Sequence, residues 1–586
     1  MTFPPPAPAA IAAQQNPPAT PEWAKDAVWY QIFPERFRNG ARQSNPRPED
    51  IGEVPFTGWR VSPWGMDWYA RDDWEQPHAA NFWTTVFQRR FGGDLVGVRE
   101  QLPYLQQLGV NALYFNPIFW APSLHKYDAI ALHHIDPTLG PDRDGDLRAL
   151  AAANETEDPA TWIWTAADRY FLDLVAEAHA RGMKVILDGV FNHSGTGCFA
   201  FQDVRRLGPK SRYADWYQIS EWRAGGTFAY ASWDGAGTLP NFGRDAETLN
   251  PGIKQYLFAI TRRWMDPSGA GWPAEGVDGW RLDVAYCVPH GFWREWHAYA
   301  RGINPEVYTT AEIVGPAQDW LRPDEFSAVM NYEWTYPTLS FFTPHPQAIG
   351  AAEFQQRINT LHARHEPGTV HILQNLLDSH DTGRVLTMLE STCPPFSGWD
   401  EYFHWAKAAN NPGLVTRQPG TRAKQALKLA VAWQFAGPGA PMIYYGTEVG
   451  MWGANDPCCR QPMLWSDIVY DDEAHGYHGP LPQATPRRPD GELLAYYQRW
   501  IALRHAESAL RRGSFRWLPT PNEHTVIFAR ELGDTAIVCA INKGDHATAL
   551  PAWPGARDLW HGKPAPTAVK PHSFVLLRLP TGVFSQ

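Results

Sequence analysis

Eight short apolar segments constrain the fold of this chain more than any other feature of its sequence. Each has the length of a strand but lacks the apolar–polar alternation of a half-exposed one, which is typical of strands buried on both faces. Helical patterns lie between several of them, and this alternation predicts an α/β fold, a parallel (β/α)8 or TIM barrel. The segments are Val28–Phe33, Ala112–Asn116, Lys184–Val190, Gly279–Val284, Val307–Ile313, Ala328–Tyr332, Ile372–Leu377 and Pro441–Tyr445.

Two amphipathic stretches between these segments predict helices. One covers Asp94–Leu108 and the other Ala167–Arg181, and a glycine follows each of them, Gly109 and Gly182. Glycine commonly ends a helix because it adopts the left-handed backbone conformation without steric cost. Each stretch therefore predicts one helix that precedes a strand of the barrel.

We expect the barrel domain over residues 23–508. The composition of the chain changes at both ends of this domain and in one stretch within it. Residues 1–22 are rich in Pro and Ala and are predicted to be disordered. The aromatic- and glycine-rich stretch 194–250, after the third strand, is expected to form a small inserted domain. Residues 509–586 hold short β-like segments separated by Gly, Asp and Pro, which predicts a C-terminal antiparallel β-sandwich.

Charge and composition argue against several classes of partner. The net charge is −11, which opposes binding to the phosphates of nucleic acid. No run approaches the roughly 18 apolar residues of a membrane span, and the Pro-rich N-terminus lacks the basic and apolar regions of a signal peptide. The six cysteines show no CxxC spacing and are interpreted as reduced thiols. We therefore expect a cytoplasmic protein without nucleic-acid or membrane partners.

Polar side chains follow four of the apolar segments. In a barrel of this kind the carboxyl ends of the strands meet at one face, which is where chemistry takes place. So many buried charges at one mouth would cost several kcal/mol without a function to retain them. The polar side chains that follow the apolar segments are Asp188 and His193 at the third segment, Arg281 and Asp283 at the fourth, Glu312 at the fifth, and His380 and Asp381 after the seventh.

This set suits the cleavage of a glycosidic bond. Such a reaction needs one ionised carboxylate to attack the anomeric carbon and one protonated carboxyl to donate to the leaving oxygen. Arg281 lies two residues before Asp283, so both side chains share one face of a strand and the cation favours an ionised Asp283. Glu312 lies in mostly apolar sequence, where desolvation would raise its pKa and suit a general acid.

From residue 23 to the end, the chain resembles the alpha-amylase family of glycoside hydrolases, and within it the neopullulanase and cyclomaltodextrinase-like members. The four polar motifs match the signatures of that family in order and context. Further matches are VWYQIFPERF at 28–37, GGDLVGV at 92–98, GVNALYFNPIF at 109–119 and APMIYYGTEVGMWG at 440–453. The resemblance implies a barrel, a domain inserted after the third strand and a C-terminal β-sandwich.

The resemblance also implies a role for each site residue. It makes Asp283 the nucleophile, Glu312 the acid/base and Asp381 the stabiliser of the transition state. It places five further residues around the sugar of the first subsite, with Tyr127 as a stacking platform: Tyr127, Asp188, His193, Arg281 and His380. The resemblance implies that no cofactor is required.

The sequence departs from these relatives in three respects. Only about 22 residues precede the first strand, whereas the subgroup usually has a starch-binding domain there that helps to build its dimer, so oligomeric state is left open. Tyr286-Cys287 and Val314 stand where the subgroup tends to have Asn-Glu and Trp, so linkage preference is left open too. Metal ligands are not assigned: Asn39, Gly92 and Asp94 could contribute to a weakened calcium site, and Asn192 to another.

We expect a retaining enzyme that hydrolyses α-glucosidic bonds in maltodextrins, cyclodextrins or related α-glucans through a covalent glycosyl-enzyme. Transglycosylation is the main alternative, because a sugar can replace water in the second step. A non-catalytic carbohydrate-binding scaffold on the same fold is a further alternative. A metal-dependent hydrolase is less favoured because the chain has no His-x-His or HExxH string.

Overall fold

A closed parallel sheet forms the centre of the computed structural model, which describes residues 20–52, 56–78, 82–273 and 275–580. Its eight strands are neighbours in the order β10-β9-β8-β5-β2-β1-β12-β11. A parallel bridge between Met330 and Gln374 joins the two ends of this order. The predicted (β/α)8 barrel is therefore confirmed. Its strands are β1 (Trp29–Ile32), β2 (Ala112–Phe115), β5 (Lys184–Gly189), β8 (Gly279–Leu282), β9 (Tyr308–Ala311), β10 (Ala328–Val329), β11 (Gln374–Leu376) and β12 (Ala440–Tyr444).

Each barrel strand overlaps the apolar segment that predicted it, but the sixth is shorter than expected. β10 contains only Ala328 and Val329, and Tyr332 already begins a helix. Next to β10, the Asn331 N–H donates to the carbonyl of Gln374 at 2.9 Å. The barrel thus closes through a few hydrogen bonds and not through a long ladder.

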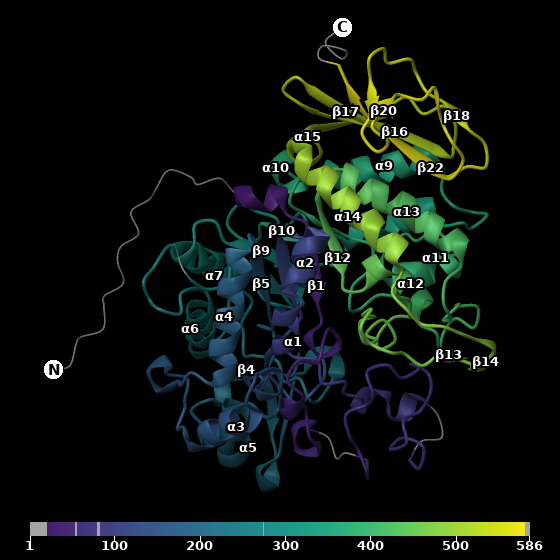
Figure 1. Cartoon of the computed structure of the whole chain (residues 1–586). Helices are drawn as coiled ribbons and strands as arrows, with labels where there is room; N and C mark the ends of the chain where they lie inside the picture. The colour runs from purple at the N-terminus through teal and green to yellow at the C-terminus, as the bar shows by residue number, and fades with distance from the viewer. Residues whose placement is uncertain (1–19, 53–55, 79–81, 274, 581–586) are drawn as a thin grey trace.

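Helices surround the barrel (Figure 1). Apolar side chains of the helices and strands form one continuous buried core. The helices are α1 (Leu95–Glu100), α2 (Leu102–Leu108), α3 (Arg143–Ala152), α4 (Ala166–Ala180), α5 (Phe199–Leu207), α6 (Pro251–Met265), α7 (His290–Ile303), α8 (Tyr332–Phe342), α9 (Ala351–His362), α10 (Pro367–Val370), α11 (Val385–Glu390), α12 (Trp399–Ala406), α13 (Thr421–Ala436), α14 (Gly491–Ala506) and α15 (Ser508–Arg512).

The single helix predicted over Asp94–Leu108 is wrong, because the structure has α1 and α2 with a break at Gln101. Pro103 explains the break, since proline has no N–H to donate and its ring clashes with the carbonyl four residues earlier. The two glycine ends are confirmed. Gly109 and Gly182 have φ of 96° and 77°, the left-handed conformation in which glycine is favoured.

The stretch 194–250 lies between β5 and α6. It contains α5 and a hairpin of β6 (Ile219–Trp222) and β7 (Phe228–Tyr230). Phe201 of α5 packs edge-on against Tyr217 and Tyr230, at ring-centroid distances of 4.9 and 5.1 Å. Two other hairpins are β3 (Phe119–Trp120) with β4 (Ala131–Ile135), and β13 (Glu473–Gly476) with β14 (Gly479–Thr485).

The C-terminal part is an antiparallel β domain, as predicted. Its six-stranded sheet has the order β15-β16-β17-β22-β19-β20, and β18 pairs with β21 beside it. Figure 1 shows this part, in yellow, at the end of the molecule opposite α3 and α5. Its strands are β15 (Ser514–Leu518), β16 (Thr525–Leu532), β17 (Thr535–Asn542), β18 (Thr548–Ala549), β19 (Arg557–Asp558), β20 (Lys563–Pro564), β21 (Ala568–Val569) and β22 (Ser573–Leu579).

The chain's N-terminal stretch is described only from residue 20. The predicted disorder over 1–22 therefore lies almost entirely outside the described residues, and from Glu22 the chain forms a 3-10 helix that ends at Asp26. The Glu22 N–H donates to the carboxylate of Glu306 at 3.0 Å. Among the described residues, no helix is long and apolar enough to cross a membrane.

Candidate active site

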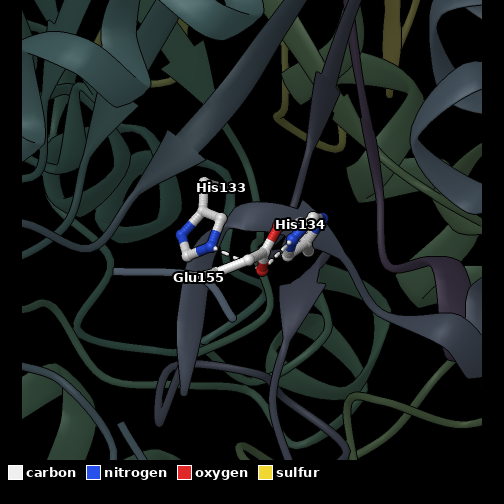
Figure 2. Close-up of side chains that lie close together, drawn as sticks. All are labelled: His133, His134 and Glu155. Atoms are coloured by element: carbon white, nitrogen blue, oxygen red, sulfur yellow. Dashed lines mark hydrogen bonds and ion pairs between the residues drawn. The ribbon is translucent and has the colours of Figure 1, made fainter. Parts of the chain in front are cut away.

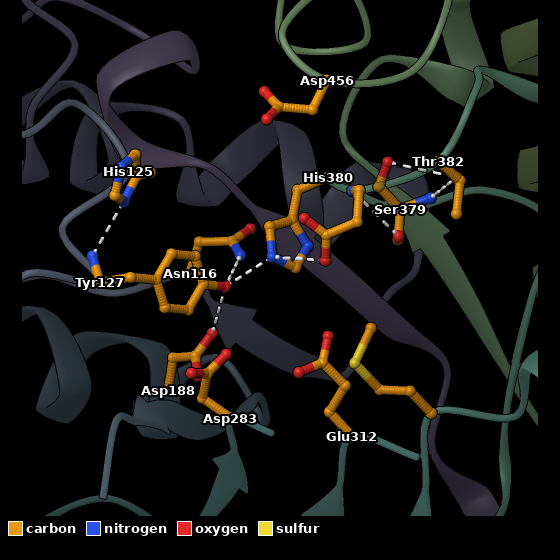
Figure 3. Close-up of polar contacts among 12 residues, drawn as sticks. Asn116, His125, Tyr127, Asp188, Asp283, Glu312, Ser379, His380, Thr382 and Asp456 are labelled. Atoms are coloured by element: carbon orange, nitrogen blue, oxygen red, sulfur yellow. Dashed lines mark hydrogen bonds and ion pairs between the residues drawn. The ribbon is translucent and has the colours of Figure 1, made fainter. Parts of the chain in front are cut away.

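Polar residues predicted at the strand ends come together at one mouth of the barrel, and Figure 3 shows four of them, Asp188, Asp283, Glu312 and His380. Asp188 lies near the carboxyl end of strand β5, and Arg281 belongs to β8. Asp283 and Glu312 each follow directly on a strand, β8 and β9. Neighbouring strands thus hold these charged side chains at the same height, because β5, β8 and β9 are paired in parallel register.

Arg281 connects three carboxylates. Its Nη1 lies 2.8 Å from Asp188 Oδ1 and 2.9 Å from Asp283 Oδ1, and its Nη2 lies 2.7 Å from Glu312 Oε1. The guanidinium is fully buried. Sequence reasoning paired Arg281 with Asp283, and the structure adds Glu312 as a partner of the same cation.

The buried carboxyl groups favour protonation more than isolated ones do. Burial raises the pKa of Asp283, and repulsion from Glu312 raises it further, while Arg281 opposes both effects. Burial also raises the pKa of Glu312 and brings that of Asp188 to about 6. Since Arg281 contacts both Asp283 and Glu312, it does not single out one of them, and the two carboxyl groups compete for a proton.

Glu312 has a second anchor in the backbone of Val284. The Val284 N–H donates to Glu312 Oε2 at 2.9 Å. Val284 has φ 38° and ψ 48°, a left-handed conformation that a β-branched residue rarely adopts. Such strain costs about 1–3 kcal/mol and is found mainly at functional sites. The strained turn places the residue after Asp283 against the neighbouring carboxylate.

Tyr127 and His380 form a hydrogen-bonded group with Asp188. The Tyr127 hydroxyl donates to Asp188 Oδ2 at 3.0 Å and also contacts His380 Nε2. Gln31 Nε2 donates to His380 Nδ1 at 2.9 Å, which leaves the proton of the neutral ring on Nε2. Burial and the nearby Arg281 lower the pKa of His380 well below its usual range. His380 is therefore a neutral donor at this site.

His193 is held as a neutral ring beside the same cleft. Its Nε2 donates to the carbonyl of Tyr127 at 3.1 Å, and its Nδ1 accepts from Asn192 Nδ2 at 3.0 Å. Burial lowers its pKa to about 3. The pair of hydrogen bonds fixes both the tautomer and the orientation of the imidazole.

Asp381 is bound from the far side of the cleft. Arg460 Nη2 lies 3.0 Å from Asp381 Oδ1, and Arg460 Nη1 lies 2.8 Å from Asp456 Oδ1. Arg460 also donates through Nε to the carbonyl of His380 at 2.8 Å. One buried arginine thus orients both residues of the His380–Asp381 pair.

These side chains border a cleft of about 600 Å³. Five of the eight predicted site residues line it: Tyr127, His193, Asp283, Glu312 and Asp381. The other three, Asp188, Arg281 and His380, lie directly behind this surface and contact the lining residues. The cleft wall also contains apolar and aromatic side chains, namely Trp233, Leu239, Val284, Tyr286, Val314, Trp399 and Phe403.

Comparison with known proteins shows to which family the sequence belongs. The sequence matches the family described as "Alpha amylase, catalytic domain" over residues 31–157 and 166–395, which is more than half of the chain. The chain belongs to the alpha-amylase family.

Individual relatives agree with the subgroup that the motifs indicated. Neopullulanase 2 of Thermoactinomyces vulgaris is 35% identical over 533 residues, 91% of this chain and 72% of that protein. Cyclomaltodextrinase of Geobacillus thermopakistaniensis (strain MAS1) is 33% identical over 543 residues, 92% of this chain and 72% of that protein. A solved structure, the ligand-free cyclic alpha-maltosyl-(1→6)-maltose hydrolase from Arthrobacter globiformis, matches with a TM-score of 0.69 and 28% identity, and covers 96% of this chain and all of that one.

Sequence reasoning missed several residues of this alpha-amylase-family cleft. Arg460 follows the eighth strand by many residues, and no local pattern linked it to Asp381. Trp399 and Phe403 are one helical turn apart on α12, and their rings stack at a centroid distance of 5.0 Å. The i, i+4 spacing of two large aromatics was a signal, but it is equally typical of a helix that packs on a core.

The calcium ligands considered from the sequence do not form a cation cage in this conformation. The Asp94 carboxylate caps α1 by accepting from the Gly97 N–H at 2.6 Å, and it also accepts from the N–H groups of Gly40 and Ala41. Asn39 Oδ1 and Asn192 Oδ1 are buried without a hydrogen-bond partner. Single neutral oxygens fit Ca²⁺ poorly, since it takes about six to eight oxygen ligands. The prediction that no cofactor is required stays untested, and so does weak calcium binding at these residues.

Proposed function

We propose that this enzyme cleaves α-glucosidic bonds in short or cyclic maltodextrins with retention of anomeric configuration. The observation that carries the proposal is the pair Asp283 and Glu312, two buried carboxylates on adjacent strand ends that share Arg281 and line one cleft. Retaining glycosidases place such carboxyl groups about 5–5.5 Å apart, with one as nucleophile and the other as acid.

In the first step, an oxygen of the ionised Asp283 attacks the anomeric carbon. Glu312 gives its proton to the glycosidic oxygen, the bond from carbon to that oxygen breaks, and a glycosyl ester of Asp283 forms. We assign the proton to Glu312 because the family motif places the acid/base there. Burial raises the pKa of Glu312, as a proton donor requires, but it raises the pKa of Asp283 too, so the motif and not the pKa decides the assignment.

In the second step, a water molecule enters on the side that the leaving group has vacated. Glu312, now ionised, takes a proton from this water, and the water oxygen attacks the anomeric carbon. The ester bond breaks and Asp283 recovers its negative charge. Two inversions at the same carbon give net retention.

The surrounding residues are assigned to the sugar of the first subsite. Asp381 and His380 would bind sugar hydroxyls, and these bonds strengthen as positive charge develops at the ring. Tyr127 would present its ring to the apolar face of the sugar. Arg281 and Asp188 act from behind: they hold Asp283 and Tyr127 in place through contacts of 2.9 and 3.0 Å.

The relatives support the proposed substrate class, because their names specify pullulan, cyclomaltodextrins and a cyclic maltosyl-maltose. We infer a cytoplasmic enzyme, because all six cysteines are free thiols.

Product analysis on cyclodextrin, maltotriose, pullulan and starch side by side tests the proposal. Rapid turnover of cyclodextrin or maltotriose with slow turnover of starch is expected, and an enzyme that cleaves none of the four would contradict it.

Transglycosylation is a second candidate because the cleft offers a surface for a sugar acceptor. Tyr286 is 49% exposed at its edge, and Trp399 and Phe403 stack farther along the wall. Aromatic rings bind the apolar faces of sugars and can hold an acceptor in the place of water. Maltotriose at high concentration would then give products longer than the substrate.

A further inference from the structure

Three potential metal ligands meet at a place that is not part of the cleft lining. The imidazole Nε2 atoms of His133 and His134 and a carboxylate oxygen of Glu155 lie within 4.8 Å of one another. None of the three lines the catalytic cleft. The geometry points to a binding site for one divalent transition-metal ion of the zinc type, with a structural role.

The side chains converge from two segments of the chain (Figure 2). His133 and His134 belong to strand β4, and Glu155 lies in the loop between α3 and α4. Both Nε2 atoms face the same oxygen, Glu155 Oε2, at 3.3 and 2.8 Å. Two ligand atoms bound to one tetrahedral Zn²⁺ at about 2.0–2.2 Å lie roughly 3.3–3.6 Å apart, which the His133 contact matches, whereas the His134 contact would have to open by about half an ångström.

The second nitrogen of each ring already has a partner. His134 Nδ1 donates to Asp168 Oδ2 at 2.8 Å, and His133 Nδ1 lies 2.8 Å from the hydroxyl of Tyr256. Glu155 Oε1 accepts from the Ile163 N–H at 2.7 Å. Metal-binding imidazoles almost always have such a partner on the other nitrogen, which fixes the tautomer and the ring orientation.

The contact between His134 and Glu155 can be satisfied in two ways. If His134 is neutral with its proton on Nδ1, then Nε2 and Glu155 Oε2 are two acceptors 2.8 Å apart. A second proton on the ring satisfies this contact, and the Asp168 and Glu155 carboxylates favour it by raising the pKa of His134 against the effect of burial. A cation that both atoms bind satisfies it as well. A metal ion satisfies both at once, and it also takes Nε2 of His133, whose distance of 3.3 Å is long for a hydrogen bond.

The charges nearby are compatible with a cation. Asp168 is paired with Arg263 at 3.0 Å, so the carboxylate of Glu155 remains as the negative charge at the centre. The two histidine side chains are almost fully buried, and the Glu155 side chain is 14% exposed. Two nitrogens and one oxygen are ligands that zinc accepts, with a water in the fourth position; this makes the site an open one, unlike the four-protein-ligand sites that are usual for structural zinc.

The location suggests what the ion does. It would tie the loop that carries Glu155 to β4, which begins four residues after Tyr127. His133 also stacks on Trp162 of the same loop, at a centroid distance of 4.5 Å. The ion would therefore stabilise the segment from which Tyr127 reaches the cleft, and it would take no part in the bond cleavage.

Metal binding to the untagged, full-length protein tests this inference. After dialysis against a chelator, we expect one Zn²⁺ per chain by calorimetry and a rise of several degrees in Tm. Co²⁺ in place of Zn²⁺ should give the visible absorption of a site with nitrogen and oxygen ligands. A Tyr256→Phe variant keeps all three ligands and should bind zinc about 10- to 100-fold more weakly.

Two ligand variants and a control distinguish this site from others. Glu155→Gln and His134→Gln should lose the zinc-dependent rise in Tm, while His524→Gln, at an exposed histidine, should keep it. Wild-type protein that binds no Zn²⁺ at 100-fold excess, or variants that bind it as well as wild type, would overturn the inference. If the ligand variants fail to fold, the Co²⁺ spectrum and the Tyr256→Phe affinity decide alone.

Discussion

Arg281 makes the charge of each active-site carboxyl group depend on the others. It contacts Asp188, Asp283 and Glu312 within 2.9 Å, so a change at one carboxyl group alters the field at the other two. Asp283 and Glu312 were predicted from single strand ends, because the carboxyl face of a barrel collects such residues. Their shared cation could not be predicted, because it depends on the spacing of β8 and β9 in space.

Replacing Glu312 by Gln removes a proton donor but keeps the shape of the side chain. General acids contribute about 10²- to 10⁴-fold, and we expect a loss of that size in kcat/KM for maltotriose. α-Glucosyl fluoride should lose much less, because fluoride departs without a proton. The alkaline limb of the pH profile, set by the raised pKa of Glu312, should disappear as well. Equal losses on both substrates would contradict a role as general acid.

His193 gives a pH-dependent prediction about stability. Its pKa is about 3 in the folded protein, below the ordinary value of 6.5, because burial penalises the charged ring. The neutral ring therefore adds stability that is complete above pH 6.5 and is lost as the pH falls towards 3. Relative to His193→Gln, the wild type should lose about 2 kcal/mol of unfolding free energy between pH 8 and pH 5.

Thermal unfolding at several pH values measures this difference. His524→Gln is the matched control, because His524 is exposed. A stability difference between wild type and His193→Gln that stays constant from pH 8 to pH 5 would show that His193 titrates normally in the folded state.

Helices and strands were predicted best where the local sequence pattern and the tertiary packing favour the same secondary structure. The strands were visible as apolar runs because a parallel sheet is buried on both faces. Strand β10 was overestimated, since the whole run Ala328–Tyr332 was taken as a strand while the chain turns into α8 at Tyr332. The α1–α2 break was missed because the amphipathic pattern continues through Gln101 and hides the effect of Pro103.

The end of α2 gives a test at the scale of one element. Gly109 has φ 96°, and a Cβ atom there would lie 2.8 Å from Cγ2 of Ile501 in α14. Gly109→Ala should therefore cost about 1–2 kcal/mol for the left-handed backbone alone, plus the clash with Ile501. Gly302 lies in α7, and a Cβ atom there would meet no neighbouring element within 4 Å, so Gly302→Ala should leave stability unchanged or raise it.

Equilibrium unfolding of the two alanine variants provides the measurement. Gly109→Ala should have a lower unfolding midpoint than Gly302→Ala. Equal midpoints would mean that α2 ends without using the special conformation of Gly109.

At the scale of the whole molecule, Trp433 joins the barrel to the C-terminal sheet. It belongs to α13, is fully buried, and stacks on Trp517 of β15 at a centroid distance of 5.6 Å. Its ring also meets Phe528 of β16 edge-on at 5.3 Å. Sequence patterns indicated both parts of the molecule, but no pattern indicated which helix the C-terminal sheet would cover.

Trp433→Ala should destabilise the protein by about 3–5 kcal/mol, the usual cost of removing a large buried aromatic side chain. Trp222→Ala is the control, because Trp222 is 38% exposed on the β6–β7 hairpin. Scanning calorimetry should show a lower Tm for Trp433→Ala, with a separate transition if the C-terminal sheet detaches first. A Tm equal to that of Trp222→Ala would show that this contact does not hold the two parts together.

The central claim is that Asp283 and Glu312 cleave the bond in two inverting steps. Proton NMR of the first sugar released, recorded before its anomers equilibrate, tests this claim most directly. Cleavage of maltotriose or a cyclodextrin by two displacements predicts that the new reducing end appears first as the α-anomer, and that the β-anomer grows in only with mutarotation. A new reducing end that appears first as the β-anomer would contradict the account.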